Sequence, residues 1–444
     1  MFVQYLRIGL LLAAGIAVLV LGILLFFGLS GTFLLKRVLY SLFVVAILFP
    51  YIRLPGDIPD VRPEFIVILV AWGFLFINHL AAGKTIRFRR CFVYKWFLLF
   101  GLCIITSMVY AAVVKGQPII WRDFWEPGKL FLYFLIFVLI ANLQLESKDV
   151  RRYYKFALIV LALSAIFGFL QYVDFGGINN VIIPHYAPTQ IHGLLTHRRI
   201  VGTFGNPNEF GALMVLAASL SISGVLFMKD RKLRMLCWST LPIFTLALFL
   251  TLSRSSLIAF FTMVIVVFFL FIHEKRLNRK LKRILIFMFF GYVIGAFLLQ
   301  VMPQKAYLRF GELKRFNQAT SWKERVENWE NHFAIWKESP WLGWGPGKAT
   351  MGTIVDNEWL LLLRRYGVIG ICVFIGLYWT FFRGLSQIRK RATEPSVVAL
   401  CVALQGTLVG YTLYMVPAAV YHCMQLMSIL LIFLGLAYSQ RRLI

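Results

Sequence analysis

The sequence predicts an all-α, polytopic integral membrane protein with about 12 or 13 transmembrane helices. Of its 444 residues, 60% are hydrophobic and only 15% are charged, whereas soluble domains average ~45–50% and ~25%. Apolar stretches of about 18 residues or more, the length that crosses ~30 Å of hydrocarbon, recur along the whole chain. A soluble domain of this size would have no interior large enough for so much apolar surface.

The apolar stretches place the spans along the chain. We expect spans near 8–30, 34–52, 65–82, 92–114, 128–144, 153–173, 210–228, 234–252, 256–273, 282–303, 366–384, 396–416 and 420–439. The first stretch exceeds the ~7–15 apolar residues of a signal peptide and has no evident cleavage site. It is expected to stay as a span or to lie in the membrane interface, which leaves the count open by one.

Clusters of lysine and arginine predict the orientation. They occur at 84–90, 148–152, 229–234, 274–283, 383–391 and the C-terminal QRR, after alternate spans. Short basic loops stay in the cytoplasm, although a lipid-headgroup patch would show the same charge. The C-terminus is therefore predicted to be cytoplasmic, and 174–209, 253–255 and 304–357 are predicted to lie outside.

A single membrane domain follows from this pattern. It comprises spans within 1–303 interrupted by the outer loop 174–209, the large outer loop 304–357, and the C-terminal spans within 358–444. The formal net charge of +27 is spread over the loops, and no basic segment stands apart as a nucleic-acid-binding module would. Membrane lipids are expected partners and nucleic acid is not.

The large outer loop contains an amphipathic helix. Its apolar residues repeat at spacings of four and three, which is the period of one helix face: Trp322, Val326, Trp329, Phe333 and Trp336. Ser321 followed by Glu324 has the spacing of a capping box. Such a face suits either a helix at the membrane interface or a helix packed on the rest of the protein.

The outer face also carries basic residues that the positive-inside rule disfavours: Arg198, Arg199, Arg254, Arg325 and Lys348. A planar guanidinium binds phosphate oxygens with two parallel hydrogen bonds. The set therefore predicts a site for a lipid phosphate or diphosphate at the outer membrane boundary. Each residue taken alone could equally be a snorkelling side chain, but a charge in the tight TLSRSS turn (251–256) indicates a function.

Two carboxylates lie where the large loop re-enters the membrane, in VDNEWLLLLRRYGVIG (355–370). Desolvation there would raise the pKa of Asp356 or Glu358 toward that of a general base. Asp356 or Asn357 could instead cap the following helix.

Two other features do not match the nucleotide or metal sites that they superficially resemble. GWGPGK (343–348) lacks the spacing of a P-loop, since Leu342 occupies the first glycine position and Ala349 follows the lysine. It is interpreted as a tight turn. The outer-loop histidines have no metal-ligand spacing, so neither a metal nor another cofactor is expected.

Four segments together resemble the O-antigen ligase and O-antigen polymerase superfamily of bacterial envelope glycosyltransferases. They are RRIVGTFGNPNEFG (198–211), TLSRSSL (251–257), SWKERVENW with SPWLGWGPG (321–347), and VDNEWLLLLRRYGVIG (355–370). The resemblance implies a metal-independent enzyme of the inner membrane whose active site faces the periplasm, and attack opposite the diphosphate is expected to invert the anomeric centre. It takes a glycan from undecaprenyl diphosphate and passes it to an acceptor hydroxyl. A chain-length regulator or other polysaccharide assembly proteins are implied partners.

The resemblance also assigns residues. Arg254 and Arg325 match the arginines that bind the diphosphate, and Arg199 and Asn208 belong to the first motif. Ligases usually begin the last motif with His-Asn, the histidine being the proposed base, whereas this chain has Asp356-Asn357. This departure favours a polymerase, which adds the glycan to another lipid-linked repeat unit, over a ligase, which adds it to the lipid A core.

A transporter or a polysaccharide-lipid flippase is the main alternative from another class. Ion-coupled transporters place carboxylates near mid-membrane and contain repeated halves. The expected spans hold almost no acidic residue away from their ends, and no repeat is evident. A scaffold without enzymatic activity would explain the spans but not the outward arginines.

Overall fold

A computed structural model describes residues 31–52, 60–81, 83, 88–188, 199–275, 320–351 and 355–441. Within these ranges the chain is helical apart from turns, loops and one isolated bridge between Ile52 and Val61. Nine of the helices described are long and apolar enough to cross a membrane. The prediction of an all-α polytopic membrane protein is confirmed.

Every predicted span within the described ranges coincides with a helix, whereas 8–30 and 282–303 lie outside them. The longer helices are α2 (Gly31–Leu48), α3 (Pro63–Ala81), α4 (Phe92–Val113), α5 (Trp125–Asn142), α6 (Ser147–Tyr172), α9 (Pro207–Phe227), α10 (Arg231–Leu250), α11 (Arg254–Lys275), α14 (Thr320–Lys337), α15 (Glu358–Arg391), α16 (Pro395–Tyr414) and α17 (Met424–Tyr438). Short helices are η1 (Trp121–Phe124), η2 (Phe175–Gly177) and α7 (Ile178–Tyr186).

The centre of the bundle is formed by α9, α16 and α17, whose residues are almost all buried. These helices are apolar on all sides, as expected of helices enclosed by other helices. Close packing of α16 on α11 uses Gly410, where an added Cβ would lie 2.6 Å from the Ala259 carbonyl oxygen. The Tyr411 hydroxyl donates to the Ala212 carbonyl oxygen at 2.8 Å and ties α16 to α9.

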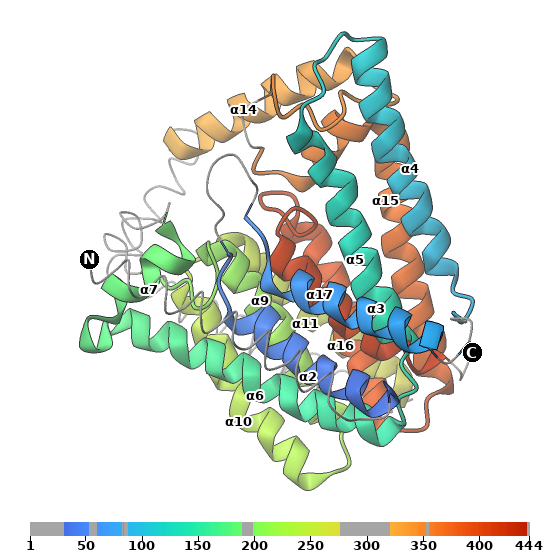
Figure 1. Cartoon of the computed structure of the whole chain (residues 1–444). Coiled ribbons are helices and arrows are strands. Elements are labelled where there is room, and N and C mark those ends of the chain that lie inside the picture. Colours follow the sequence, from blue (N-terminus) through green and yellow to red (C-terminus); the bar gives the residue numbers. More distant parts are fainter. Residues whose placement is uncertain are drawn as a thin grey trace, which may run out of the picture.

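The basic loops gather at one end of the bundle. Arg441 Nη2 donates to the Arg89 carbonyl oxygen at 2.8 Å, and Arg389 Nη1 pairs with Glu274 Oε2 at 3.2 Å. From this end α4 and α15 run side by side toward the opposite end, across which α14 lies (Figure 1). We call the opposite end the α14 end. The alternation of basic and less basic connections is thus present in three dimensions.

Helix α14 packs on the protein through part of its apolar stripe. Trp329 contacts a buried cluster of Val355, Leu360 and Leu361 at the start of α15. Phe333, in contrast, is 42% exposed on α14. Of the two interpretations of this helix, packing on the rest of the protein is confirmed for the Trp329 side. The side chains of the proposed capping box lie outside the described ones.

Helix α15 breaks at Gly367, and the loop before it inserts its backbone into the break. Gly367 has φ +63°, and a Cβ there would lie 2.2 Å from the Trp341 carbonyl oxygen. The break frees the carbonyl of Arg364, which accepts a hydrogen bond from the Trp344 N–H at 2.9 Å. The glycines of 343–347 turn the loop with positive φ. The predicted tight turn is confirmed, and it seats the large loop against α15.

Candidate active site

The described part of the first motif (199–211) forms a turn at the α14 end that is held by side-chain hydrogen bonds. Gly202 has φ +54°, and the Gln171 side chain of α6 bonds both its N–H and its carbonyl oxygen at 2.9 Å. Asn206 then caps α9 by accepting from the Asn208 N–H at 2.8 Å, with Pro207 at the first helical position. The motif thus fixes where α9 begins.

The TLSRSS turn starts α11 in the same way. Leu252 adopts φ +51°, a conformation that non-glycine residues rarely take and that is enriched at functional sites. The Ser253 hydroxyl oxygen accepts from the Ser256 N–H at 3.3 Å and caps the helix. Arg254 is consequently the first residue of α11.

The structure brings these two motifs together. Arg199 Nε donates to the Thr251 carbonyl oxygen at 2.8 Å, and its Nη2 donates to Asn208 Oδ1 at 3.1 Å. The Ser256 hydroxyl donates to the Asn208 carbonyl oxygen at 3.0 Å. Gly211 allows this approach, since its Cβ would meet Ser256 Oγ at 2.5 Å. We call Arg199, Asn208, Thr251, Arg254 and Ser256 the motif junction.

The motif junction favours an anion. Helices α9 and α11 both begin there, and the N-terminus of a helix carries a partial positive charge. Arg254 is exposed, and no described residue accepts a hydrogen bond from its guanidinium. Two arginines beside two helix N-termini are a suitable arrangement for phosphate oxygens. Arg198, the other predicted arginine of this motif, lies outside the described residues.

The Arg325–Asp356 pair lies where α14 meets the start of α15. Arg325 Nη2 and Asp356 Oδ2 are 3.6 Å apart, and the side chains are 39% and 53% exposed. Next to them, Asn357 caps α15 by accepting from the Leu360 N–H at 3.0 Å. The predicted cap is confirmed for Asn357. Asp356 is therefore an ion-paired surface carboxylate within this chain and is not enclosed by protein.

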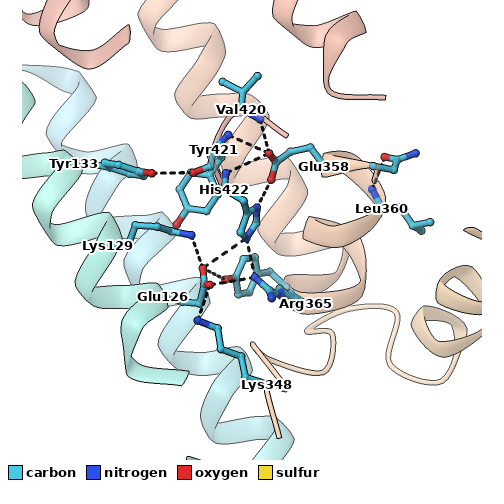
Figure 2. A network of polar contacts seen from close by, with 12 residues as sticks. Glu126, Lys129, Tyr133, Lys348, Glu358, Leu360, Arg365, Val420, Tyr421 and His422 are labelled. Atoms are coloured by element: carbon cyan, nitrogen blue, oxygen red, sulfur yellow. Dashed lines mark hydrogen bonds and ion pairs between the residues drawn. The ribbon is translucent and has the colours of Figure 1, made fainter. Parts of the chain in front are cut away.

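Glu358, in contrast, is fully buried and holds the loop between α16 and α17 (Figure 2). Its Oε2 accepts from the backbone N–H groups of Val420 at 2.8 Å, Tyr421 at 3.0 Å and His422 at 3.4 Å. Its Oε1 bonds the His422 ring through Nδ1. Four donors on one carboxylate leave little capacity for another partner.

The far nitrogen of the His422 ring faces Arg365. Arg365 Nη1 lies 2.7 Å from His422 Nε2 (Figure 2). A guanidinium has no acceptor, so Nε2 accepts this bond and the ring proton resides on Nδ1, directed at Glu358. Glu358, His422 and Arg365 therefore form one directional chain of hydrogen bonds.

Glu126 forms ion pairs with three basic side chains. Its carboxylate, 3% exposed, pairs with Lys129 at 2.9 Å, Lys348 at 3.1 Å and Arg365 at 3.2 Å. Lys129 also lies over the Tyr421 ring. A buried carboxylate without such partners would cost several kcal/mol. Lys348 thus belongs to this cluster, whereas Arg199 and Arg254 lie at the motif junction.

Sequence reasoning missed Glu126, Arg365 and His422. WEPGK (125–129) carries an acid and a base three residues apart at the start of an apolar run, which is one turn of a helix. This spacing places the Glu126 and Lys129 side chains on one face of a helix and could have indicated their ion pair. His422 has no comparable signal, because its partners come from helices far away in the chain.

A buried histidine also links α14 to α15. The His332 side chain is 2% exposed, and Arg364 Nη1 lies 3.0 Å from its Nδ1. Burial, and then the charge of Arg364, lower the pKa of His332 from 6.5 to about 4. His332 is thus held neutral in the folded protein, while in the unfolded chain it takes up a proton near its ordinary pKa.

We expect the stability of the α14–α15 contact to fall with acidification. Between about 6.5 and about 4 the unfolded chain binds more protons at His332 than the folded one, so acid favours unfolding in this window. The midpoint of unfolding in mild detergent, followed by tryptophan fluorescence, measures this. A His332→Asn variant should show a weaker dependence on pH there, and an unchanged dependence would contradict the assignment.

One comparison with known proteins is informative. Residues 238–375 match the family model described as O-Antigen ligase. No curated protein matches the chain. The matched segment includes the TLSRSS turn, α14 with Arg325, and the start of α15 with Asp356 and Glu358. This match covers less than half of the chain and agrees with the resemblance of its motifs to the O-antigen ligase and polymerase superfamily.

Proposed function

We propose that the protein is a polysaccharide polymerase of the bacterial inner membrane. It would transfer a glycan from undecaprenyl diphosphate to a hydroxyl of another lipid-linked repeat unit at the outer, periplasmic face. The observation that carries this proposal is the motif junction, where Arg199 and Arg254 lie beside the N-termini of α9 and α11. A diphosphate at the membrane boundary matches that charge.

The chemistry needs a good leaving group. As the bond between the anomeric carbon and the diphosphate breaks, negative charge grows on the diphosphate oxygens. Preorganised cations that meet this charge lower the barrier, and removing one such group typically costs about 10²–10³ in rate. Attack by the acceptor from the face opposite the diphosphate inverts the anomeric centre.

Arg325 is the proposed third contact. Its ion pair with Asp356 is 3.6 Å long and largely solvated, and pairs of this kind contribute only about 0–1 kcal/mol. The guanidinium can therefore exchange this partner for a diphosphate oxygen at little cost. Lys348 is a weaker candidate, because its ammonium already pairs with the buried Glu126 carboxylate.

The last motif supports polymerase over ligase, because Asp356 stands where ligases usually carry histidine. The matched family description favours the ligase as the second candidate. Deleting the gene in its host and resolving the envelope glycan on a gel separates them. We expect core capped with a single repeat unit. Uncapped core with accumulated lipid-linked chains would indicate the ligase, and unaffected glycan would contradict both in favour of a transporter or scaffold.

A further inference from the structure

We propose that His422 is the general base of the transfer reaction and that Glu358 is the residue that positions it. The inference rests on the proposed function and adds the residue that receives the acceptor's proton. Neither residue shows its role in the sequence, since 64 positions separate them. The structure brings them into one hydrogen-bonded pair next to Arg365.

The geometry of the pair suits a base. Glu358 is fully buried and fixed by three backbone N–H groups, so its bond to His422 Nδ1 sets both the ring orientation and the tautomer. The nitrogen left to accept a proton is Nε2. A histidine held by a carboxylate at one nitrogen and basic at the other is the arrangement that general-base catalysis requires.

The two carboxylates of the last motif are weaker candidates. Asp356 is 53% exposed and paired with Arg325. It is therefore neither buried nor free of an ionic partner, and both features make it a weaker candidate for the base. The Glu358 carboxylate already accepts from three N–H groups and the imidazole. His422 Nε2 is contacted by side chains alone among the described residues: Arg365 Nη1 lies at 2.7 Å and Glu126 Oε2 at 3.6 Å.

His422 is connected through its neighbours in the chain to both groups of arginines. The residue after it, Cys423, hydrogen-bonds the Glu209 carboxylate, and Glu209 follows Asn208 of the motif junction. On the other side, Glu358 lies two residues after Asp356, the partner of Arg325. The His422 side chain keeps 14% of its surface exposed, which leaves an edge for the acceptor.

The acceptor hydroxyl replaces the Arg365 N–H at Nε2, and Arg365 keeps its pair with Glu126 at 3.2 Å. The hydroxyl oxygen then bonds to the anomeric carbon, and its proton passes to Nε2. The bond from the anomeric carbon to the diphosphate oxygen breaks, and that electron pair leaves with the lipid diphosphate. The imidazolium formed is stabilised by Glu358 and later releases its proton to water.

The test uses two nucleophiles on the full-length protein in lipid nanodiscs. Glycan transfer to a lipid-linked hydroxyl acceptor needs a base, whereas azide attacks the anomeric carbon as an anion and needs none. With His422→Gln we expect hydroxyl transfer to fall by about 10²–10⁴, the usual contribution of a general base. Formation of the glycosyl azide, and the KM for the donor, should stay within about threefold of wild type.

Two further variants sharpen the result. Glu358→Gln keeps an oxygen for the backbone donors but turns an N–H toward Nδ1, which moves the ring proton to Nε2 and removes the base. It should therefore lose hydroxyl transfer about 10-fold or more and retain azide transfer. His79→Gln is the matched control, because among the described residues the His79 ring bonds the Leu75 carbonyl oxygen of its own helix α3, and it should match wild type.

The outcomes are distinct. Hydroxyl transfer by His422→Gln at the wild-type rate would overturn the proposal. A parallel loss of both reactions would also overturn it, because that pattern indicates a purely structural role for the ring. If the wild-type protein forms neither product, the proposed function itself fails.

Discussion

Glycan transfer is expected to fall roughly 100- to 1000-fold when Arg254 is replaced by alanine. Arg254 is exposed at the first position of α11, next to the Arg199–Thr251 contact. Its removal takes away a positive charge that meets the diphosphate as the glycosidic bond breaks. The measurement is product formation from lipid-linked donor by the purified variant, with its abundance in the membrane determined in parallel.

Arg231→Ala is the matched control for this prediction. Arg231 is likewise exposed and likewise the first residue of a helix, α10, but it lies at the end of the bundle that carries the basic loops. We expect wild-type transfer from this variant. Equal activity of the Arg254 and Arg231 variants would remove the motif junction from the mechanism.

The largest loss of stability is expected from Glu358→Ala. The change removes a fully buried carboxylate and leaves the N–H groups of Val420 and Tyr421 without their acceptor. Breaking a buried, hydrogen-bonded charge pair typically costs about 3–5 kcal/mol. Unfolding of the purified protein by titration with a denaturing detergent measures this cost.

Asp356→Ala provides the comparison, because it removes a carboxylate two residues earlier in the chain. Asp356 is 53% exposed and its partner Arg325 is 39% exposed, so the loss should not exceed about 1 kcal/mol. If the two variants unfold at the same detergent concentration, Glu358 does not hold the α16–α17 loop in place.

Hydropathy and charge were sufficient to predict the membrane fold. Nine of the described helices are long and apolar enough to span, and the runs predicted within the described residues are helices. The motifs also predicted the residues of the motif junction. The turns before α9 and α11 each contain a helix cap and an arginine. Two such turns met at the motif junction because both helices begin at the α14 end.

The buried charge network was beyond sequence reasoning. Glu126 and Arg365 are far apart in the chain. Their contact depends on α5, α15 and α17 packing together. Local patterns contain no information about such pairing. By its depth, the last motif predicts desolvated carboxylates, but of its two carboxylates the chain buries only Glu358 and places Asp356 on the surface.

Binding of the donor tests the central claim most directly. Affinity of the protein in nanodiscs for undecaprenyl diphosphate carrying a glycan would be measured for wild type, Arg254→Ala and Arg231→Ala. We predict that Arg254→Ala binds about 10- to 150-fold more weakly, the equivalent of the ~1.5–3 kcal/mol of one hydrogen bond to a charged group, and that Arg231→Ala binds like wild type. Equal affinity of all three proteins would contradict a diphosphate site at the motif junction.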